Sequence, residues 1–335
     1  MDIVSSDSEQ AREGGGPVFI AGQERSGTSL LYALLGSHSR ISMTRRLNWW
    51  TFFDRRYGEL SDDGDLDRCL DAMMHYRRHL KLEPDAAQLR ADFVAGPRTY
   101  GRLLSLLARQ RADRVGKPRW GDKSLHTERY AERVFSEFPD ATIIHIIRDP
   151  RDRYASALKR WSGGRGGVAV ASAIWNRTAD LAVRHSADYP DRYMALRYED
   201  QAQQPEEQLK RVCELIGETY EPQMLGMGAD PDFREAGNSS YGEPTAGAIS
   251  TSSIGRYREV LTDWQIRHIQ DRAGARLEYW DYPVHEASMR PVDAALYRIV
   301  RHPSRLAIEA VWRSRERVLD VSGRSPSRHT LVEAP

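Results

Sequence analysis

Residues 17–36 read PVFIAGQERSGTSLLYALLG, and this stretch decides the fold. Pro17 precedes an apolar run of strand length at residues 18–21. After the turn residues GQERSGTS, apolar side chains return at a helical spacing, at Leu30, Leu31, Leu34 and Leu35. A loop between a strand and a helix N-terminus presents backbone N–H groups that bind anions. The stretch therefore predicts a P-loop-like strand, loop and helix with an anion site in the loop.

The loop departs at one position from GxxxxGK[ST], the signature of nucleoside-triphosphate enzymes. Gly22, Gly27 and Ser29 fit that signature, but Thr28 stands where the lysine belongs. That lysine reaches the terminal phosphates, so its absence argues against a standard ATPase or GTPase. Arg25 still suits a 5′-phosphate group. The alternative is a tight strand-to-helix turn in which glycine is needed for steric reasons alone.

Further units of the same kind follow along the chain. Residues 141–147 and 193–196 are apolar runs of strand length, and helical patterns begin at Asp152 and at Pro205. Strands without polar alternation are typical of parallel sheets buried on both faces. We therefore expect an α/β fold, a single domain with a central parallel β-sheet flanked by helices.

A second anion site is predicted at the end of the second apolar run, in the sequence RDPRDR. Arg148 would lie at the carboxyl end of that strand, where open α/β sheets bind ligands. Asp152 can cap the next helix, on which Ser156 and Arg160 share one face. The three cationic and hydroxyl side chains can then converge on one dianion. Two phosphate sites on neighbouring strands imply a doubly phosphorylated nucleotide.

Taken together, these stretches resemble the PAPS-dependent sulfotransferases, which use 3′-phosphoadenosine-5′-phosphosulfate (PAPS). PVFIAGQERSGTSLL is similar to the family's 5′-phosphosulfate loop, and ATIIHIIRDPRDRYASAL to its 3′-phosphate strand and helix. Three more segments match in order: RWGDKS around Lys123, RYED at 197–200 and SSIGRYREVL at 252–261. The resemblance covers the chain from about residue 17 to about residue 282.

The resemblance implies a sulfotransferase that moves the sulfuryl group from PAPS to an acceptor by in-line displacement and releases PAP, with no metal. The acceptor would offer a hydroxyl or amine on a small molecule, a carbohydrate or a tyrosine-like group. The residues that the resemblance assigns to the 5′-phosphosulfate are Arg25, Ser26, Gly27, Thr28 and Ser29. Those that it assigns to the 3′-phosphate are Arg148 and Ser156. Arg160, Tyr198 and Arg256 match positions that contact the 3′-phosphate or adenine in some members.

Two alternatives to ligand contact stay open at these positions. Arg148 can instead form a strand-end salt bridge with Asp149 or Asp152. Tyr198 can instead be an ordinary packing residue.

For the chemistry, the resemblance assigns Arg25 and Lys123 to the charge that develops on the transferring group. Related enzymes often carry a glutamate base about twenty residues after the loop, but here that neighbourhood holds Arg45 and Arg46. We rank His126 first as the base, and the other candidates are Asp122, Glu24 and Asp54. An acidic acceptor hydroxyl would need no strong base.

The acceptor side is predicted in residues 45–57, where aromatic side chains lie among four arginines. The aromatic residues are Trp49, Trp50, Phe52, Phe53 and Tyr57, and the arginines are Arg45, Arg46, Arg55 and Arg56. Stacking and positive charge would suit an aromatic, glycosidic or anionic acceptor. The alternative is that the aromatic rings belong to the core and the arginines cover them.

The domain prediction has three parts: a disordered leader at 1–16, a sulfotransferase domain at 17–285 and a basic helical C-terminal extension at 286–335. The extension carries nine arginines, which we interpret as a solvated helical face. The Gly- and Ser-rich residues 226–253 are predicted to form a lid over the nucleotide.

Composition narrows the remaining functions. The 49 Lys and Arg residues balance 48 Asp and Glu residues, so the net charge of +1 favours no nucleic-acid partner. The two cysteines are too few for a disulfide framework, and no stretch is long and apolar enough to span a membrane, so we expect a cytoplasmic protein. A homo-oligomer stays open. The rival hypotheses are a PAP-binding protein of the same fold with reduced catalysis and a P-loop kinase.

Overall fold

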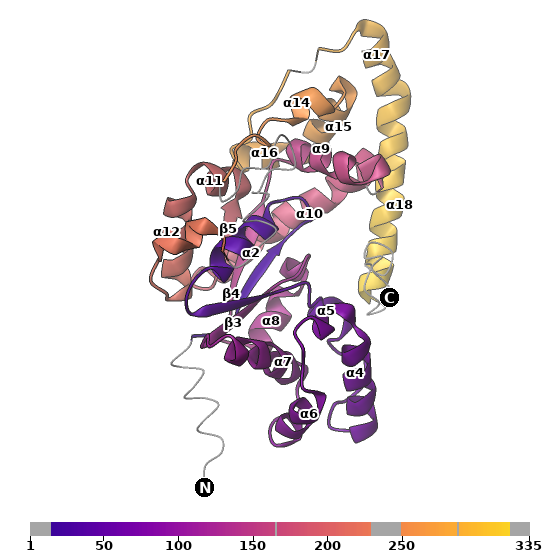
Figure 1. Ribbon diagram of the computed structural model, residues 1–335. Coiled ribbons are helices and arrows are strands. Elements are labelled where there is room, and N and C mark those ends of the chain that lie inside the picture. Colours follow the sequence, from indigo (N-terminus) through magenta and orange to yellow (C-terminus); the bar gives the residue numbers. More distant parts are fainter. Residues whose placement is uncertain (1–14, 165, 229–248, 287, 322–335) are drawn as a thin grey trace.

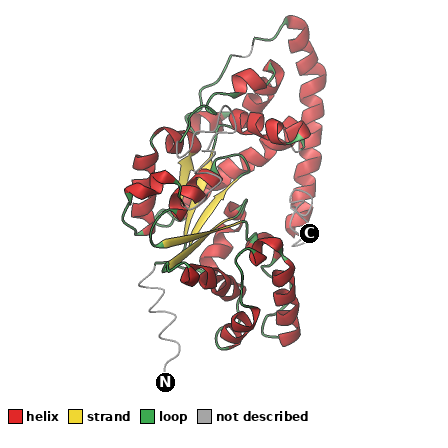
Figure 2. Cartoon of the chain, in the orientation of Figure 1, coloured by secondary structure: helices red, strands yellow, loops and turns green. Residues whose placement is uncertain are grey.

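The computed structural model describes residues 15–164, 166–228, 249–286 and 288–321 (Figure 1). Five parallel strands form one sheet in the order β2-β3-β1-β4-β5. The strands are β1 (Val18–Gly22), β2 (Ile41–Arg45), β3 (Arg119–Lys123), β4 (Thr142–Ile147) and β5 (Tyr193–Arg197). Figure 2 shows the strands at the centre with helices on both sides. The predicted fold class, an α/β fold with a central parallel sheet, is confirmed.

Helices connect the strands and cover the sheet. Between β1 and β3 they are α2 (Thr28–Gly36), α3 (Trp49–Phe52), α4 (Asp63–His75), α5 (Arg77–Leu80), α6 (Ala86–Val94) and α7 (Tyr100–Arg114). Between β3 and β5 they are η1 (Thr127–Tyr130), α8 (Ala131–Glu137), α9 (Pro150–Arg160), η2 (Ser162–Gly164) and α10 (Gly167–Asp188). After β5 they are α11 (Tyr198–Gln203), α12 (Pro205–Ile216), η3 (Pro222–Gly226), α14 (Tyr257–Val260), α15 (Asp263–Ala273), α16 (Ala275–Tyr279), α17 (Pro291–Leu296), η4 (Tyr297–Arg301) and α18 (His302–Val321).

The three strands expected from apolar runs are present as β1, β4 and β5. The strands β2 and β3 were missed because their sequences, ISMTR and RWGDK, lack an apolar run. In β3 the charged side chains Arg119, Asp122 and Lys123 are buried, each at 3% exposure or less. Buried charged residues at a strand end usually belong to a polar network or a site.

The sheet packs on two separate apolar cores because successive side chains of a strand point to opposite faces. Val18 and Ile20 of β1 lie in one cluster with the leucines of α2 and with Leu209 of α12. Phe19 lies in the other cluster, packed edge-on against Trp50 and Trp120. This second face is covered by α7 and α8. Burial on both faces confirms the prediction made from the continuous apolar strands.

The central strand β1 ends at Gly22, beside β4. The φ angle of Gly22 is +131°, and a Cβ there would lie 2.7 Å from the carbonyl oxygen of Ile146. Glycine is therefore required for the chain to leave the sheet at this point. The carboxyl ends of β1, β3 and β4 are neighbours, which places three loops at one edge of the sheet.

The C-terminal helices α17, η4 and α18 form one continuous run, and α18 lies alongside α10 (Figure 1). Glu309 of α18 forms a bidentate pair with Arg272 at 2.7 and 2.9 Å. One face of this extension is thus packed rather than solvated. The division of the chain at residue 285 stays a prediction. None of the helices in the described ranges is long and apolar enough to cross a membrane.

Two sequence predictions fall largely outside the described residues. The leader at 1–16 is described only from residue 15, and the segment 226–253 is described only at its two ends, 226–228 and 249–253.

Candidate active site

The phosphate loop is a tight turn that ends at the N-terminus of α2. Arg25 and Gly27 have φ angles of 69° and 95°, and the N–H group of Ser26 donates to the carbonyl of Gln23 at 3.2 Å. Gly27 is the N-cap residue of α2. Among the described residues no side chain caps this helix N-terminus, and its first turn carries no acidic residue. The first N–H groups of α2 and its positive dipole end are therefore available to an anion.

The two predicted anion sites meet at Arg25. Its Nε donates to the hydroxyl of Ser156 at 2.9 Å, and its carbonyl oxygen accepts from Nη1 of Arg148 at 2.9 Å. Arg148 and Ser156 are buried, at 5% and 2% exposure. The loop after β1 and the strand end after β4 thus form one continuous polar surface rather than two separate sites.

Tyr198, the first residue of α11 directly after β5, completes this surface. A Cβ on Gly27 would lie 2.2 Å from Cδ2 of the Tyr198 ring, so the ring packs directly on the phosphate loop. The guanidinium of Arg148 lies 4.4 Å from the centre of the same ring. Cation–π contact and burial fix the orientation of Arg148. Tyr198 is therefore a packing residue, which was one of the two alternatives for it. The residues that it packs against, Gly27 and Arg148, both belong to the site.

Ser253 was not singled out by sequence reasoning, yet it contacts the same cluster. Its carbonyl oxygen accepts from Nη2 of Arg148 at 2.8 Å, and its hydroxyl lies 2.8 Å from that of Tyr198. The only signal in the sequence was its place in SSIGRYREVL. The contact brings the segment after residue 249 against the strand ends.

The predicted helix cap at Asp152 is wrong. The carboxylate of Asp149 accepts from the N–H group of Arg151 at 2.8 Å and caps α9, because Pro150 already occupies the first helical position. Asp152 instead accepts from the N–H groups of Gly255 and Tyr257 at 2.6 and 2.8 Å. Burial and the nearby Asp149 charge raise its pKa to about 6. Asp152 therefore anchors the segment that carries Ser253.

The strand-end salt bridge proposed as an alternative for Arg148 is formed by its neighbour. Arg151 pairs with Asp149 at 2.6 Å. Arg148 instead donates to two carbonyl oxygens and lies against an aromatic ring. A buried arginine whose hydrogen bonds go to neutral acceptors has no bidentate carboxylate partner in the described residues, which leaves its guanidinium suited to a phosphate.

Lys123 is the last residue of β3, next to β1 in the sheet. It is buried, and it lies opposite Arg45 in the register of β2 and β3. Burial, together with the charges of Arg45 and Arg46, lowers the pKa of Lys123 to about 7. An anion at this strand end would restore the usual preference of the ammonium for its charged form.

The base candidate Asp122 points away from Lys123, because adjacent strand residues face opposite sides. Its carboxylate accepts from the hydroxyls of Ser124 and Thr44 at 2.6 and 3.0 Å, and burial raises its pKa. Asp54 pairs with Arg133 at 3.3 Å. Asp122 and Asp54 are therefore engaged with partners of the protein itself, Asp122 with two hydroxyls and Asp54 with Arg133.

His126 lies between two carboxylates. Its Nε2 is 3.5 Å from Glu24 of the phosphate loop and its Nδ1 is 3.6 Å from Glu128. Burial alone would lower the pKa of His126, but hydrogen bonding to Glu128 and Glu24 outweighs it and raises the pKa. Burial would raise the pKa of Glu24, but His126 brings it down to about 2. This arrangement favours an imidazolium between two carboxylates, which is a poor proton acceptor.

Glu128 is a site residue that sequence reasoning missed. It is fully buried and accepts from the N–H group of Gly22 at 3.1 Å and from the hydroxyl of Thr178 at 3.1 Å. No pattern in the segment TERY marks it, because its role arises only when η1 folds beneath the end of β1. Glu128 ties the phosphate loop to α10.

Arg160 and Arg256 lie at the edge of this arrangement. Arg160 is exposed at the last residue of α9, whereas Arg148 and Ser156 are buried. Arg256 is partly exposed and pairs with Glu259 at 3.0 Å. Both stay predictions as nucleotide contacts.

The predicted acceptor segment, residues 45–57, is mainly core. Trp49, Trp50 and Phe53 are buried at 4% exposure or less, and Phe52 and Tyr57 pack on the same cluster. The alternative reading of these rings as core residues fits the structure. Arg55 and Arg56 are exposed at the end of the segment.

Comparison with known proteins identifies the family. A family model described as the sulfotransferase family matches residues 17–222, a range that contains the phosphate loop, Lys123, Arg148 and Tyr198. This chain belongs to the sulfotransferase family. The resemblance inferred from the sequence is thereby confirmed, and the chain is a sulfotransferase-family enzyme.

Two solved structures share the fold of this sulfotransferase. The sulfotransferase domain from the curacin biosynthetic pathway is 19% identical, with a TM-score of 0.54 over 81% of this chain and 99% of that domain. The sulfotransferase domain of the Synechococcus PCC 7002 olefin synthase is 19% identical, with a TM-score of 0.55 over 80% of this chain and 95% of that domain. A mouse sulfotransferase crystallised with PAP is more distant, at 13% identity and a TM-score of 0.45, over 79% of this chain and 86% of that one.

A curated relative, an uncharacterised protein of Aquifex aeolicus (strain VF5), is 25% identical over 222 residues. The match covers 62% of this chain and 26% of that protein, so the chain spans about a quarter of the relative's length. The acceptor of this sulfotransferase is not identified by these similarities.

Proposed function

We propose that this sulfotransferase moves the sulfuryl group of PAPS to a hydroxyl or amine of an acceptor and releases PAP. The observation that supports it most is the pair of contacts at Arg25, which joins the phosphate loop to Ser156 and Arg148. A nucleotide with phosphates at both its 5′ and 3′ positions needs two anion sites within one molecule's reach. Direct contact between the two predicted sites meets that need.

The residues present fit such a nucleotide. The uncapped N-terminus of α2 and the Arg25 side chain suit the 5′-phosphosulfate, together with Ser26, Thr28 and Ser29. Nε of Arg148 is buried without a hydrogen-bond partner in the described structure, so one donor of this guanidinium awaits an acceptor. Arg148 and Ser156 would hold the 3′-phosphate, with Tyr198 beside them.

When bound, PAPS supplies an activated sulfuryl group on a phosphate leaving group. Lys123 and Arg25 would stabilise the negative charge that grows on the leaving side. Lys123 is desolvated at the end of β3, and Arg25 lies in the loop after the neighbouring strand β1. Such stabilisation acts on the transition state more than on donor binding.

The contacts of His126 bear on which group, if any, acts as the general base. His126 is ranked first by sequence, but its two carboxylate partners hold it as a cation that orients Glu24. We therefore favour an acceptor whose hydroxyl is acidic enough to lose its proton late in the reaction, with no strong base. A cytoplasmic location and a homo-oligomer stay part of the proposal.

The test is sulfate transfer from PAPS, read by mass spectrometry, with PAP binding measured by thermal shift on the same protein. PAP should raise the melting temperature, because it binds the native state, and Arg148→Ala should abolish the shift. Arg211→Ala is the control, at an exposed arginine of α12 that is not assigned to the nucleotide site, and it should keep the shift.

The rival hypotheses give different results in the same assays. PAP binding without transfer to any member of a broad acceptor panel would favour the catalytically reduced protein. A magnesium-dependent shift by ATP that PAP cannot displace would favour a kinase. No PAP shift with folded protein would overturn the proposal.

A further inference from the structure

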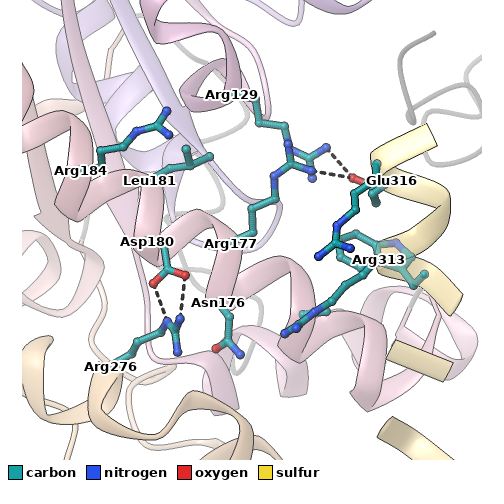
Figure 3. Close-up of a pocket in the computed structure, with 12 residues that line it drawn as sticks. Arg129, Asn176, Arg177, Asp180, Leu181, Arg184, Arg276, Arg313 and Glu316 are labelled. Atoms are coloured by element: carbon teal, nitrogen blue, oxygen red, sulfur yellow. Dashed lines mark hydrogen bonds and ion pairs between the residues drawn. The ribbon is translucent and has the colours of Figure 1, made fainter. Parts of the chain in front are cut away.

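A polar pocket lies away from the phosphate loop, between η1, α10, α16 and α18 (Figure 3). Its volume is about 570 Å³, which is in the range of small-molecule sites. Six arginines line it: Arg129, Arg177, Arg184, Arg276, Arg313 and Arg317. None of these residues belongs to the phosphate loop, the end of β4 or the contacts of Ser253.

The lining carries far more positive than negative charge. The two carboxylates among the lining residues are Asp180 and Glu316, so arginines exceed them by four. Asp180 is held by Arg276 at 2.6 and 2.7 Å. One oxygen of Glu316 accepts from both Arg129 and Arg177, at 3.0 and 3.2 Å, as Figure 3 shows.

Acidic residues outside the pocket offset only part of this surplus. Glu309 pairs with Arg313 but also with Arg272, and Arg184 lies 3.4 Å from Glu132 and 4.0 Å from Asp188. Nε of Arg129 is buried without a hydrogen-bond partner in the described chain. Arg129 of η1 and Arg177 of α10 therefore share one buried carboxylate, and Arg129 also has a buried donor without an acceptor, which is costly unless an anion compensates.

The remaining wall is suited to an organic group. Trp312, Leu181 and Ala173 provide apolar surface, and Asn176 provides an amide. Because both apolar and cationic groups line one pocket, inorganic ions would use only part of it. We propose that this pocket binds a small organic phosphate or sulfate ester, with its anionic group on the arginines and its organic part against Trp312.

This pocket is distinct from the donor site, but residues next to each other in the sequence serve the two places. Glu128 of η1 and Thr178 of α10 contact each other beneath the phosphate loop. Their sequence neighbours Arg129 and Arg177 meet at Glu316 in the pocket. The elements η1 and α10 thus contribute to both sites. The proposal that the arginine-lined pocket binds an ester does not depend on PAPS being the donor.

The test uses isothermal titration calorimetry with 1-naphthyl phosphate, 1-naphthyl sulfate and neutral 1-naphthol, with PAP present in excess. The variant Arg313→Gln/Arg317→Gln removes two lining charges. The matched control Arg298→Gln/Arg315→Gln removes two exposed arginines of the same helical run that do not line the pocket. Arg272 keeps its pair with Glu309 in both proteins.

We expect the esters to bind the wild type and the control equally, and the lining variant about tenfold or more weakly, because charge-assisted contacts are lost. 1-Naphthyl phosphate should bind more tightly than 1-naphthyl sulfate, because it brings more negative charge to the arginines. Equal binding by both double variants, or binding of 1-naphthol as tight as that of the phosphate, would overturn the proposal. The PAP thermal shift, measured on the same protein, reports the donor site independently, so failure of one proposal is separable from failure of the other.

Discussion

The carboxylate of Glu128 accepts a hydrogen bond from the backbone N–H group of Gly22, 3.1 Å away, across 106 residues of sequence. Gly22 is where β1 ends and the phosphate loop begins. The same carboxylate lies beside His126, which in turn contacts Glu24 within the loop. Glu128 therefore fixes the loop at its first residue and, through His126, at its third.

Replacing Glu128 by Gln tests this role. The amide keeps one acceptor for Gly22 but loses the charge that faces His126, so we expect a loss of about 2 to 3 kcal/mol in the free energy of unfolding. PAP affinity should fall as well, because the loop is less well positioned. Chemical denaturation and PAP titration measure the two effects. Glu132→Gln is the control, since Glu132 is exposed one turn later, and equal effects of the two substitutions would contradict the assignment.

Gly27 and Tyr198 give a second prediction. At Gly27 a Cβ would meet the Tyr198 ring at 2.2 Å and the φ angle is +95°, so Gly27→Ala combines strain with a clash. We expect a loss of about 3 kcal/mol or more in stability and loss of PAP binding, because overpacking adds to the cost of a left-handed alanine.

Gly116→Ala separates the two causes. Gly116 has a φ of +67°, and a Cβ added there would meet no atom within 4 Å, so only backbone strain remains. It should cost about 1 kcal/mol and leave PAP binding unchanged. A Gly27→Ala protein that binds PAP like the Gly116→Ala protein would contradict the tight contact between loop and ring.

These contacts show which parts of the site the sequence can predict. The loop 22–29 and Arg148 were predictable because a glycine turn and a strand-end arginine have local signatures. Asp152 was misassigned because its hydrogen-bond donors, the N–H groups of Gly255 and Tyr257, lie about a hundred residues away in the sequence. The strands β2 and β3 escaped prediction because their polar side chains are buried by partners from other elements. Glu128 and Ser253 likewise act through long-range contacts that no local pattern encodes.

Lys123 gives a prediction about protons. Its pKa of about 7, lowered by burial and by Arg45 and Arg46, means that at pH 8 the side chain is mainly neutral before ligand binds. A phosphate nearby favours the charged form and raises the pKa. PAP binding at pH 8 should therefore take up a proton, seen as a dependence of the binding enthalpy on the ionisation enthalpy of the buffer.

The Lys123→Met variant should lose this proton uptake, and in the transfer assay its kcat should fall more than its PAPS affinity. Lys159→Met, at an exposed lysine of α9, is the matched control and should keep the proton uptake. Protons taken up by PAP itself appear equally in both variants, so the difference between the variants reports Lys123. The same proton uptake in both variants would contradict the role of Lys123.

Glu199 gives a prediction about stability and pH. It is buried beneath the end of β4, where it accepts from the N–H group of Asp149 and the hydroxyl of Tyr282, both at 3.0 Å. Burial and the Asp149 charge raise its pKa from 4.5 to about 7. Because the folded state binds this proton more tightly than the unfolded state, the group costs stability as pH rises from 4.5 to 7, and the full cost remains above pH 7.

Glu199→Gln removes that cost while keeping both hydrogen bonds, since an amide accepts from Asp149 and donates to the tyrosine oxygen. At pH 8 we expect the variant to be more stable than the wild type by about 1 to 3 kcal/mol, and below pH 4.5 the difference should vanish. Denaturant unfolding across this pH range measures it. Glu206→Gln, at an exposed residue of α12 paired with Lys210, should show a small effect with no such pH dependence. A Glu199→Gln difference that stays constant from pH 4 to 8 would mean that Glu199 is not the group that titrates.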